Sequence, residues 1–346
     1  MKTKIIKINP TRIENNKIKS ASKVINNGGL VAFPTETVYG LGADALNENA
    51  VKKIFITKGR PADNPLIVHI ANKNDIKKLV KEIPKNTNKL INKFFPGPLS
   101  LVLFKSKIVP EIISAGSNTV AIRMPENKIA LALIKEAKTP IAAPSANLFS
   151  KPSPTKASHV IQDLKGKIEM IIDGGETRIG LESTVLDMTT KPPTLLRPGG
   201  INLEELRKVI GKVNIHPHLL DKKIKKEVIK SPGMKYKHYS PNAKIYLVLG
   251  EKEKVNEKIK NLSKKFKRDG NKVGIMTLDK NNNYESDQIK NIGNNLENIA
   301  KNLFNVFREF DKDKVDVILA EGISEKGLGL AIMNRLKRAT FKVIKV

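Results

Sequence analysis

The chain has 346 residues, enough for about two domains, and its 40% hydrophobic and 28% charged content is typical of a folded protein and excludes wholesale disorder. It has no cysteine, which excludes disulfides and thiolate metal sites. It has no run of about 18 apolar residues and no apolar stretch after its basic start, which excludes a membrane-spanning helix and a signal peptide. We therefore expect a cytoplasmic protein. The formal net charge of +29 favours anionic partners, namely nucleotides, RNA or membrane surfaces, unless it reflects a lysine-rich proteome.

Strand-like and helix-like segments alternate over the first 210 residues. Apolar residues at helical spacing predict helices at 74–82, at 127–137 and from a capping Asn49 to near Gly59. Short apolar runs bounded by turn residues predict strands at 30–33, 66–70, 99–104, 120–123, 168–172, 184–187 and 194–197. This alternation is typical of an α/β domain.

The rest of the chain contains a connecting segment and a second α/β pattern. Residues 211–242 have weak periodicity and are too long for an ordinary connector, so we expect a linker that packs onto another part of the protein. From residue 243 the pattern predicts a small parallel sheet with helices on both faces. The predicted strands are 245–249, 273–277 and 315–320, and the predicted helices are 251–267, 296–310 and 331–339. The pair Gly327 and Gly329 lacks the third glycine of a dinucleotide motif and predicts a helix entry instead.

Two polar stretches of the first 210 residues predict a ligand site. The first runs from a strand at Phe33 through a turn rich in threonine to Asp44. The second places Lys58 and Arg60 at a helix end and Asn64 in a loop between two prolines. Arginine offers phosphate a planar fork and lysine offers it a point charge. Read singly, each stretch could be an ordinary turn or a helix end with favourable cations, but the stiff loop favours a built site.

Further polar residues follow predicted strands. Small residues at 140–144 lead into Ser145 and Asn147, and no nucleophile-elbow sequence surrounds Ser145, so we interpret it as a hydrogen-bonding residue. Arg123 follows a buried strand and therefore needs an anion or an acidic partner. Arg197 also follows a strand, shortly after Ser183. Together these residues favour anion binding and nucleotidyl transfer over covalent catalysis.

Three of these sequence features together resemble the Sua5/YrdC family. They are the run 33–42, the segment 231–241, which reads Ser-Pro-Gly-Met-Lys-Tyr-Lys-His-Tyr-Ser-Pro, and the tetrad Lys58, Arg60, Ser145 and Asn147. The resemblance covers essentially the whole chain and is closest to the two-domain members. It implies an α/β protein in which residues 1–210 form a YrdC-like catalytic domain with a twisted mixed sheet and a concave basic cleft. It further implies that residues 211–242 form a linker and lid crossing the active site, and that residues 243–346 form a smaller Rossmann-like, three-layer α/β Sua5 domain.

The resemblance also implies an activity. Members of this kind are nucleotidyltransferases that condense L-threonine, bicarbonate and ATP into threonylcarbamoyl-AMP and pyrophosphate, the first step of t6A modification in tRNAs that read ANN codons. Mg²⁺ would arrive with ATP rather than at a site made by the protein alone, and no organic cofactor is implied. The product would pass to a transferase complex of the TsaD type, with tRNA as a further partner and no membrane involved.

Matching the family pattern residue by residue assigns roles to individual positions. The catalytic positions are the tetrad Lys58, Arg60, Ser145 and Asn147. The ATP-binding positions are these four together with Asn64, Thr119, Ser153, Arg197 and Ser231. The L-threonine positions are Thr37, His69, Arg123, Ala143 (through its backbone) and Ser183, with Arg123 pairing with the threonine carboxylate. Tyr236 would be a lid residue.

Other functions remain open at this point. A tRNA- or double-stranded-RNA-binding protein without catalysis would suit the charge, although only 5% of the residues are aromatic and tryptophan is absent, which is poor for base stacking. Hydrogenase-maturation carbamoyltransferases share the catalytic module but carry cysteine-rich zinc segments, which the absence of cysteine disfavours. The residues do not decide the role of the C-terminal domain, the oligomeric state or the delivery of the product.

Overall fold

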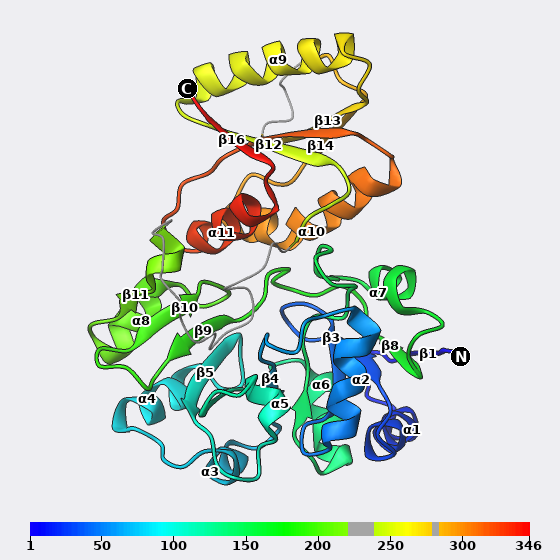
Figure 1. Ribbon diagram of the computed structural model, residues 1–346, viewed down its shortest axis with the longest axis vertical. Coiled ribbons are helices and arrows are strands. Elements are labelled where there is room, and N and C mark those ends of the chain that lie inside the picture. Colours follow the sequence, from blue (N-terminus) through cyan, green and yellow to red (C-terminus); the bar gives the residue numbers. More distant parts are fainter. Residues whose placement is uncertain (221–238, 279–283) are drawn as a thin grey trace. The chain divides into compact units, whose positions relative to one another are not determined.

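The structure is a computed structural model that describes residues 1–220, 239–278 and 284–346. The chain divides into two compact units, each with its own sheet (Figure 1). Unit 1 comprises Met1–Phe149 and Ser153–Tyr236, and unit 2 comprises Ser150–Pro152 and Lys237–Val346. The predicted boundaries at 210 and 242 did not anticipate that the short segment 150–152 groups with the C-terminal unit.

Unit 1 is built on one mixed sheet. In the described part of the chain its 11 strands follow the order β1-β8-β2-β3-β7-β4-β6-β5-β9-β10-β11. Parallel pairs such as β4–β6 lie beside antiparallel pairs such as β5–β6, and this mixture confirms the predicted fold class. The strands are β1 (Lys4–Lys7), β2 (Val31–Phe33), β3 (Gly40–Asp44), β4 (Ile67–His69), β5 (Leu99–Phe104), β6 (Thr119–Arg123), β7 (Ile141–Ala142), β8 (Met170–Asp173), β9 (Thr184–Asp187), β10 (Thr194–Arg197) and β11 (Asn214–Ile215).

Helices α1 and α6 pack against this sheet through their apolar faces. Ile18 and Ile25 of α1, Leu133 of α6 and Phe33 of β2 belong to one buried cluster, and burying apolar side chains in this way is the main stabilising contribution to the fold. The helices are α1 (Asn15–Asn26), α2 (Glu48–Lys58), α3 (Ile76–Leu79), α4 (Lys85–Phe94), α5 (Glu111–Ser114), α6 (Lys128–Ala137), α7 (Ala157–Leu164) and α8 (Leu203–Ile210), with 3₁₀ turns η1 (Lys73–Asp75) and η2 (Pro217–Leu220).

Helix α2 leads directly to the candidate site, and both of its ends have identifiable causes. The predicted cap, Asn49, was wrong: Asn47 has the extended backbone that a cap requires, and its side chain accepts the N–H of Ala50 at 3.1 Å. At the other end Gly59 has φ +63°, the left-handed conformation that glycine adopts without a Cβ penalty. The helix therefore stops at Lys58, and the chain turns immediately afterwards.

Other differences from the predicted elements have local reasons. The segment predicted as a polar turn contains strand β3, because its glycine-rich end pairs with β2 on one side and β7 on the other. The helix predicted to reach residue 82 ends at Leu79, since Val80 forms a bridge with Lys105 instead. No helix in the described ranges has the length and apolar character that crossing a bilayer requires.

Unit 2 is a three-layer α/β unit and confirms the predicted parallel sheet. Over its described residues five strands follow the order β14-β13-β15-β12-β16, and every pairing is parallel. Helix α9 covers one face of the sheet, and α10 and α11 cover the other (Figure 1). The strands are β12 (Lys244–Leu249), β13 (Val273–Thr277), β14 (Gln288–Asn291), β15 (Val317–Glu321) and β16 (Lys342–Lys345), and the helices are α9 (Lys252–Arg268), α10 (Leu296–Lys312) and α11 (Gly329–Ala339).

Candidate active site

Lys58 is the last residue of α2, and its side chain reaches the loop that follows β7. Its Nζ donates to the main-chain carbonyl of Ser145 at 2.6 Å and also to that of Asn147. In return, the N–H of Phe149 donates to the carbonyl of Lys58 at 2.9 Å. Lys58 is only 3% exposed, so these carbonyl oxygens compensate the desolvation of its ammonium group. Three members of the tetrad therefore meet at one point.

The loop after β7 is fixed by main-chain hydrogen bonds to the start of β3. The N–H of Ala146 donates to the carbonyl of Tyr39, and the N–H of Leu41 donates to the carbonyl of Pro144, both at 2.8 Å. The two backbones approach so closely that a Cβ on Gly40 would lie 3.2 Å from the Cβ of Ala143. The small residues in both stretches are therefore a requirement of this packing.

The segment from Glu36 to Tyr39 connects several loops of unit 1. The carbonyls of Glu36 and Thr37 accept the N–H groups of Ile179 and Gly180, at 2.9 and 3.1 Å. The N–H of Tyr39 donates to the carbonyl of Pro154 at 2.8 Å. The Thr37 hydroxyl lies 2.8 Å from that of Thr35, and both side chains are buried. This threonine-rich segment therefore holds several loops of the candidate site together.

Tyr39 helps to hold that segment in place. Its hydroxyl donates to the carbonyl of Gly175 at 2.6 Å and accepts the N–H of Gly174 at 3.2 Å. Burial raises the pKa of the Tyr39 phenol above its ordinary range, so the phenol stays neutral and serves as a structural hydrogen-bonding group.

Arg60 and Asn64 form a second polar group just beyond α2. Arg60 Nη2 donates to the carbonyls of Asn64 and Pro65 at 3.2 and 3.0 Å, which closes the proline-flanked loop on itself. The Asn64 side chain is 2% exposed, yet neither its oxygen nor its nitrogen has a hydrogen-bond partner among the described residues. Each such unsatisfied buried group costs about 1–3 kcal/mol. A polar ligand atom placed beside this carboxamide would remove that cost.

Arg123 ends β6 and forms a buried ion pair with Glu36. Its Nη2 lies 2.7 Å from Glu36 Oε1, and both side chains are 4% exposed. Arg123 Nε donates to the carbonyl of Gly97 at 3.3 Å, and Glu36 Oε2 accepts the N–H of Glu126 at 3.1 Å. The expected anionic or acidic partner of Arg123 is therefore Glu36. Neither contact of the guanidinium uses Nη1, which leaves that group to be considered for a ligand.

His69 is the neighbour of Arg123 in the β4–β6 ladder. Its Nδ1 lies 3.2 Å from the carbonyl of Ile67, so the proton on Nδ1 is donated to that oxygen. Burial, together with the charge of Arg123, lowers the pKa of His69 to about 3. The imidazole is therefore neutral near pH 7 and can act there as a hydrogen-bonding group but not as a cation.

This environment predicts a pH-dependent contribution of His69 to stability. Between its ordinary pKa of 6.5 and its folded pKa of about 3, the unfolded chain binds the proton and the folded chain does not. The contribution of His69 to the free energy of unfolding is therefore fully present above pH 6.5 and falls by about 1.4 kcal/mol per pH unit between pH 6.5 and about pH 3. Urea unfolding of the wild type and of His69→Asn between pH 4 and 8 checks this, because the variant should lose that slope. Parallel pH profiles for the two proteins would contradict the assignment.

Ser183 and Arg197 lie together at the start of β9 and the end of β10. Arg197 Nη2 donates to the Ser183 hydroxyl at 3.1 Å, and its Nε donates to the Ser183 carbonyl at 3.0 Å. The hydroxyl of Ser100 lies 2.8 Å from that of Ser183. A residue assigned to threonine and one assigned to ATP are thus in direct contact, so the two predicted subsites are adjacent.

Of the remaining predicted residues, two have contacts with residues outside the predicted set and two lie outside the described residues. Thr119 contacts the Ser117 hydroxyl at 2.9 Å, and the Ser153 hydroxyl donates to a Glu182 carboxylate oxygen. Ser231 and Tyr236 fall in 221–238, outside the described residues. Sequence reasoning gave no role to several residues that contact predicted ones, among them Glu36, Ser100 and Glu182. Glu36 stood in the polar stretch from Phe33 to Asp44 that was already singled out, and the unmatched charge of Arg123 was the signal that could have found it.

The chemistry available here is that of anion binding. Four cationic side chains of the site are each less than 10% exposed, namely Lys58, Arg60, Arg123 and Arg197. A buried cation attracts an anion more strongly than an exposed one does, because little water screens the two charges. No group of three or more histidine, aspartate or glutamate side chains suited to a metal ion occurs among the residues that the structure describes. Hydroxyl and amide groups surround these cations, which suits the positioning of a phosphate-bearing substrate.

Comparisons with known proteins agree with this description over the whole chain. A family model described as "Telomere recombination" matches residues 23–199, and one described as "Threonylcarbamoyl-AMP synthase, C-terminal domain" matches residues 201–340. The threonylcarbamoyl-AMP synthase of Pyrococcus abyssi is 56% identical over 97% of this chain and 97% of its own length. That of Bacillus subtilis is 47% identical over 93% and 92%.

A solved structure shows the same architecture. The crystal structure of P. abyssi Sua5 complexed with L-threonine has a TM-score of 0.95 and 55% identity, and the match covers 99% of this chain and 100% of that one. These findings confirm the resemblance to the Sua5/YrdC family and the predicted fold class.

Proposed function

The chain belongs to the Sua5/YrdC family of threonylcarbamoyl-AMP synthases, and from this membership we propose that unit 1 condenses L-threonine, bicarbonate and ATP into threonylcarbamoyl-AMP, pyrophosphate and water. It is thus an enzyme of the nucleotidyltransferase class. The observation that carries the proposal for this chain is the contact of Lys58 with the main chain of Ser145 and Asn147, which gathers three signature residues at one point.

The reaction needs no nucleophile from the protein. The threonine amino group first joins bicarbonate with loss of water to give a carbamate. A carbamate oxygen then attacks the α-phosphorus of ATP, the bond to the β-phosphate oxygen breaks, and pyrophosphate leaves with that electron pair. Both reactants are anions, so the protein must bring like charges together and stabilise the charge that develops on the phosphates. We assign this task to Lys58 and Arg60.

The nucleotide is proposed to lie against the loops that follow α2 and β7. Asn64 supports this part of the proposal, because its buried carboxamide has both a donor and an acceptor to offer. Thr119, Ser153 and Arg197 complete the proposed ATP contacts, and Ser231 belongs to the same proposal. Tyr236 is proposed as part of a lid, which would protect the mixed anhydride product from water.

The threonine subsite is proposed around Arg123 and His69. The guanidinium is already oriented by Glu36, and its Nη1 group would receive the threonine carboxylate. Neutral His69 would offer a hydrogen bond without adding a second positive charge. Thr37, Ser183 and the backbone of Ala143 complete the proposed threonine contacts.

Mg²⁺ is proposed to enter with ATP. The hydroxyl of Ser145 and the amide oxygen of Asn147 are hard oxygen donors of the kind that this ion accepts, and Mg²⁺ is commonly bound through substrate phosphates with few protein ligands. When bound, the ion would neutralise charge on the phosphates. The residues present fit that arrangement, and we assign every other role at the site to the side chains and backbone of the protein.

The product's chemistry implies a partner. Threonylcarbamoyl-AMP is a reactive mixed anhydride, so we propose that it is passed in the cytoplasm to a separate TsaD-type transferase complex that modifies tRNA. Binding of RNA without catalysis is the alternative suggested by the charge of +29, and no feature among the described residues of unit 1 favours it over this reaction.

The proposal is tested by following pyrophosphate in the absence of tRNA. The purified full chain is expected to release pyrophosphate from ATP and Mg²⁺ only when both L-threonine and bicarbonate are present. Omitting each co-substrate in turn, and replacing L-threonine by D-threonine, supplies the controls. If the rate of pyrophosphate release stayed the same when L-threonine or bicarbonate was omitted, the activity would be that of an ATP pyrophosphatase, and the proposed condensation would be contradicted.

A further inference from the structure

A pocket of about 750 Å³ opens in unit 2 at the carboxyl edge of its parallel sheet. Its lining comes from the ends of four neighbouring strands: Gly250 follows β12, Leu278 follows β13, Asn291 ends β14 and Glu321 ends β15. In open parallel sheets, ligands bind in the crevice outside this edge. The residues proposed for synthesis of the adenylate belong to unit 1 or to 221–238, so the proposed reaction does not use this pocket.

The pocket lies where the chain reverses its winding direction. Strands β12 and β15 are adjacent and parallel. The chain leaves β12 into α9 on one face of the sheet and leaves β15 into α11 on the other face (Figure 1). Two neighbouring loops that diverge in this way leave a crevice between them, and such a switch point is the usual ligand position in this architecture. Gly250 and Gly322, the residues that directly follow these two strands, both line the pocket.

One wall of the pocket carries an acid. Glu321 is 7% exposed, and its Oε1 accepts the hydroxyl of the fully buried Thr277 at 2.6 Å. Thr277 therefore orients a carboxylate that lines the pocket. In sheets of this type an acidic residue at a strand end accepts hydrogen bonds from the hydroxyls of a ribose.

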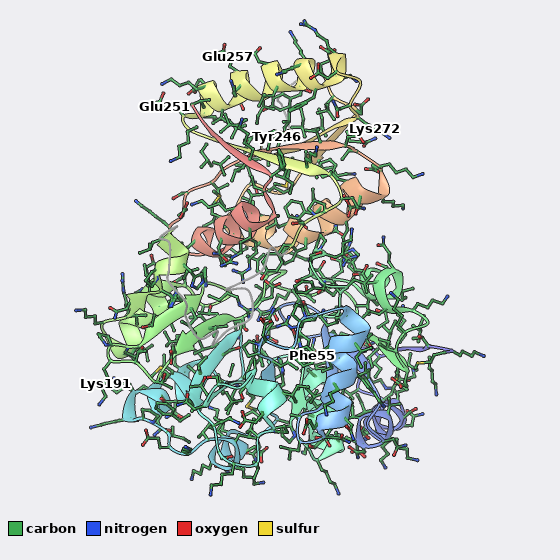
Figure 2. The ribbon with its side chains drawn as sticks, viewed as in Figure 1. Phe55, Lys191, Tyr246, Glu251, Glu257 and Lys272 are labelled. Carbon is green, nitrogen blue, oxygen red and sulfur yellow. The ribbon has the colours of Figure 1, made fainter. Side chains whose placement is uncertain are left out.

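Another part of the lining suits an anion. Lys252 stands in the first turn of α9, and Figure 2 shows Glu251 immediately before it at the start of that helix. The Glu251 side chain forms no capping hydrogen bond to α9. The start of α10 contributes Asn298, and a Cβ on Gly293, which has φ +123°, would lie 2.6 Å from the Cβ of Asn298, so the glycine backbone packs directly against this helix end. The N–H of Asn298 already donates to the Asn295 side chain at 2.8 Å, so the start of α9 together with Lys252 is the part of the lining that suits a phosphate.

We propose that this pocket binds a ribonucleoside monophosphate. Glu321 accepts hydrogen bonds from the ribose hydroxyls, and the phosphate lies near Lys252 at the start of α9. The volume falls within the range of about 300–1,000 Å³ that is usual for small-ligand sites. The described loops do not contain the three-glycine motif with which dinucleotide sites bind a pyrophosphate, so a mononucleotide fits better than a dinucleotide.

Hydrogen–deuterium exchange on the full chain tests this proposal, because it locates binding separately in each unit. AMP is expected to slow exchange in peptides that cover 249–255, 291–298 and 320–324, and 2′-deoxy-AMP should do so more weakly. Inorganic phosphate alone should give little protection. Protection by AMP that is confined to unit 1 would overturn the proposal, and equal protection by phosphate would reduce the pocket to an anion site and overturn the ribonucleotide assignment.

Variants make the assignment specific. Glu321→Gln keeps the shape of the side chain and its contact with Thr277, and is expected to raise the AMP concentration for half-maximal protection by about tenfold. Lys252→Ala changes a surface residue and should weaken AMP binding without affecting the fold. The matched control is Glu325→Gln, an exposed acid outside the pocket lining that pairs with Lys337 at 2.6 Å. Unchanged AMP protection in both Glu321→Gln and Lys252→Ala would overturn the placement of the ligand.

Discussion

Replacing Lys58 by alanine is expected to lower threonine-dependent pyrophosphate release by about 10²- to 10³-fold, the loss seen when one preorganised charge-stabilising donor is removed from an active site. The ammonium group is buried and donates hydrogen bonds to the carbonyls of Ser145 and Asn147. Replacing it by a water molecule would therefore cost free energy. The measurement is the steady-state rate at saturating substrates, with the unfolding midpoint recorded for the same preparation.

Two further variants separate catalysis from folding. Lys58→Met keeps most of the aliphatic stem and removes only the charge, so it should retain more stability than the alanine variant but no more activity. Lys52→Ala alters a lysine of the same helix whose side chain is 52% exposed and pairs with Glu48 at the surface, and it should behave like the wild type. Near-normal turnover in both Lys58 variants would show that this residue only supports the loop.

Removing Arg123 is expected to destabilise the protein by about 3–5 kcal/mol, since Glu36 would remain as an uncompensated buried charge. Both side chains are 4% exposed, so solvent cannot reach the carboxylate without local opening. Urea unfolding of Arg123→Met, followed by a signal that comes from unit 1, measures this loss of stability. The same variant should fail to use threonine at concentrations that saturate the wild type.

A double variant shows whether the loss comes from the ion pair. Glu36→Gln combined with Arg123→Met removes both charges and is expected to recover most of the stability, because a buried ion pair contributes little net free energy relative to neutral residues of similar size. Threonine use should remain impaired in the double variant. If the double variant is as unstable as the sum of the single ones, the coupling between these residues is absent and the account of this pair is wrong.

The sequence predicted well those helices and strands that are determined by residues close together in the chain. The helix 127–137 has apolar residues at helical spacing and the strand 99–104 is a short apolar run after a turn, and the structure has α6 at Lys128–Ala137 and β5 at Leu99–Phe104. The cap of α2 was misplaced by two residues because Asn47 and Asn49 are both suitable cap residues. Backbone conformation distinguishes them, and that conformation follows from the turn after β3 rather than from the asparagine itself.

The contacts that assemble the candidate site are long-range, and no spacing in the sequence encodes them. Glu36 and Arg123 are separated by 87 positions, as are Lys58 and Ser145, and these residues meet only because strands from distant parts of the chain are neighbours in one sheet. The sequence could show that a buried arginine needs an acid but could not identify which one. The family resemblance supplied the tetrad, and the fold shows how the backbone brings three of its members into contact.

The pocket of unit 2 was beyond sequence reasoning for a related reason. Its lining is drawn from four strand ends, and only the order β14-β13-β15-β12 places Glu321 beside Gly250. The glycines that the sequence did single out, Gly327 and Gly329, lead into α11 and are not part of the pocket lining. Strand order, which short-range patterns do not determine, is thus what creates the proposed site.

The most direct test of the central claim is to identify the product. The full chain is incubated with ATP, Mg²⁺, L-threonine and ¹³C-bicarbonate without tRNA, and the nucleotides are resolved by rapid chromatography and mass spectrometry. Our account predicts an adenylate that contains threonine and one ¹³C atom in its carbamoyl group. An unlabelled threonyl adenylate, or AMP and pyrophosphate formed without any threonine-containing adenylate, would contradict it.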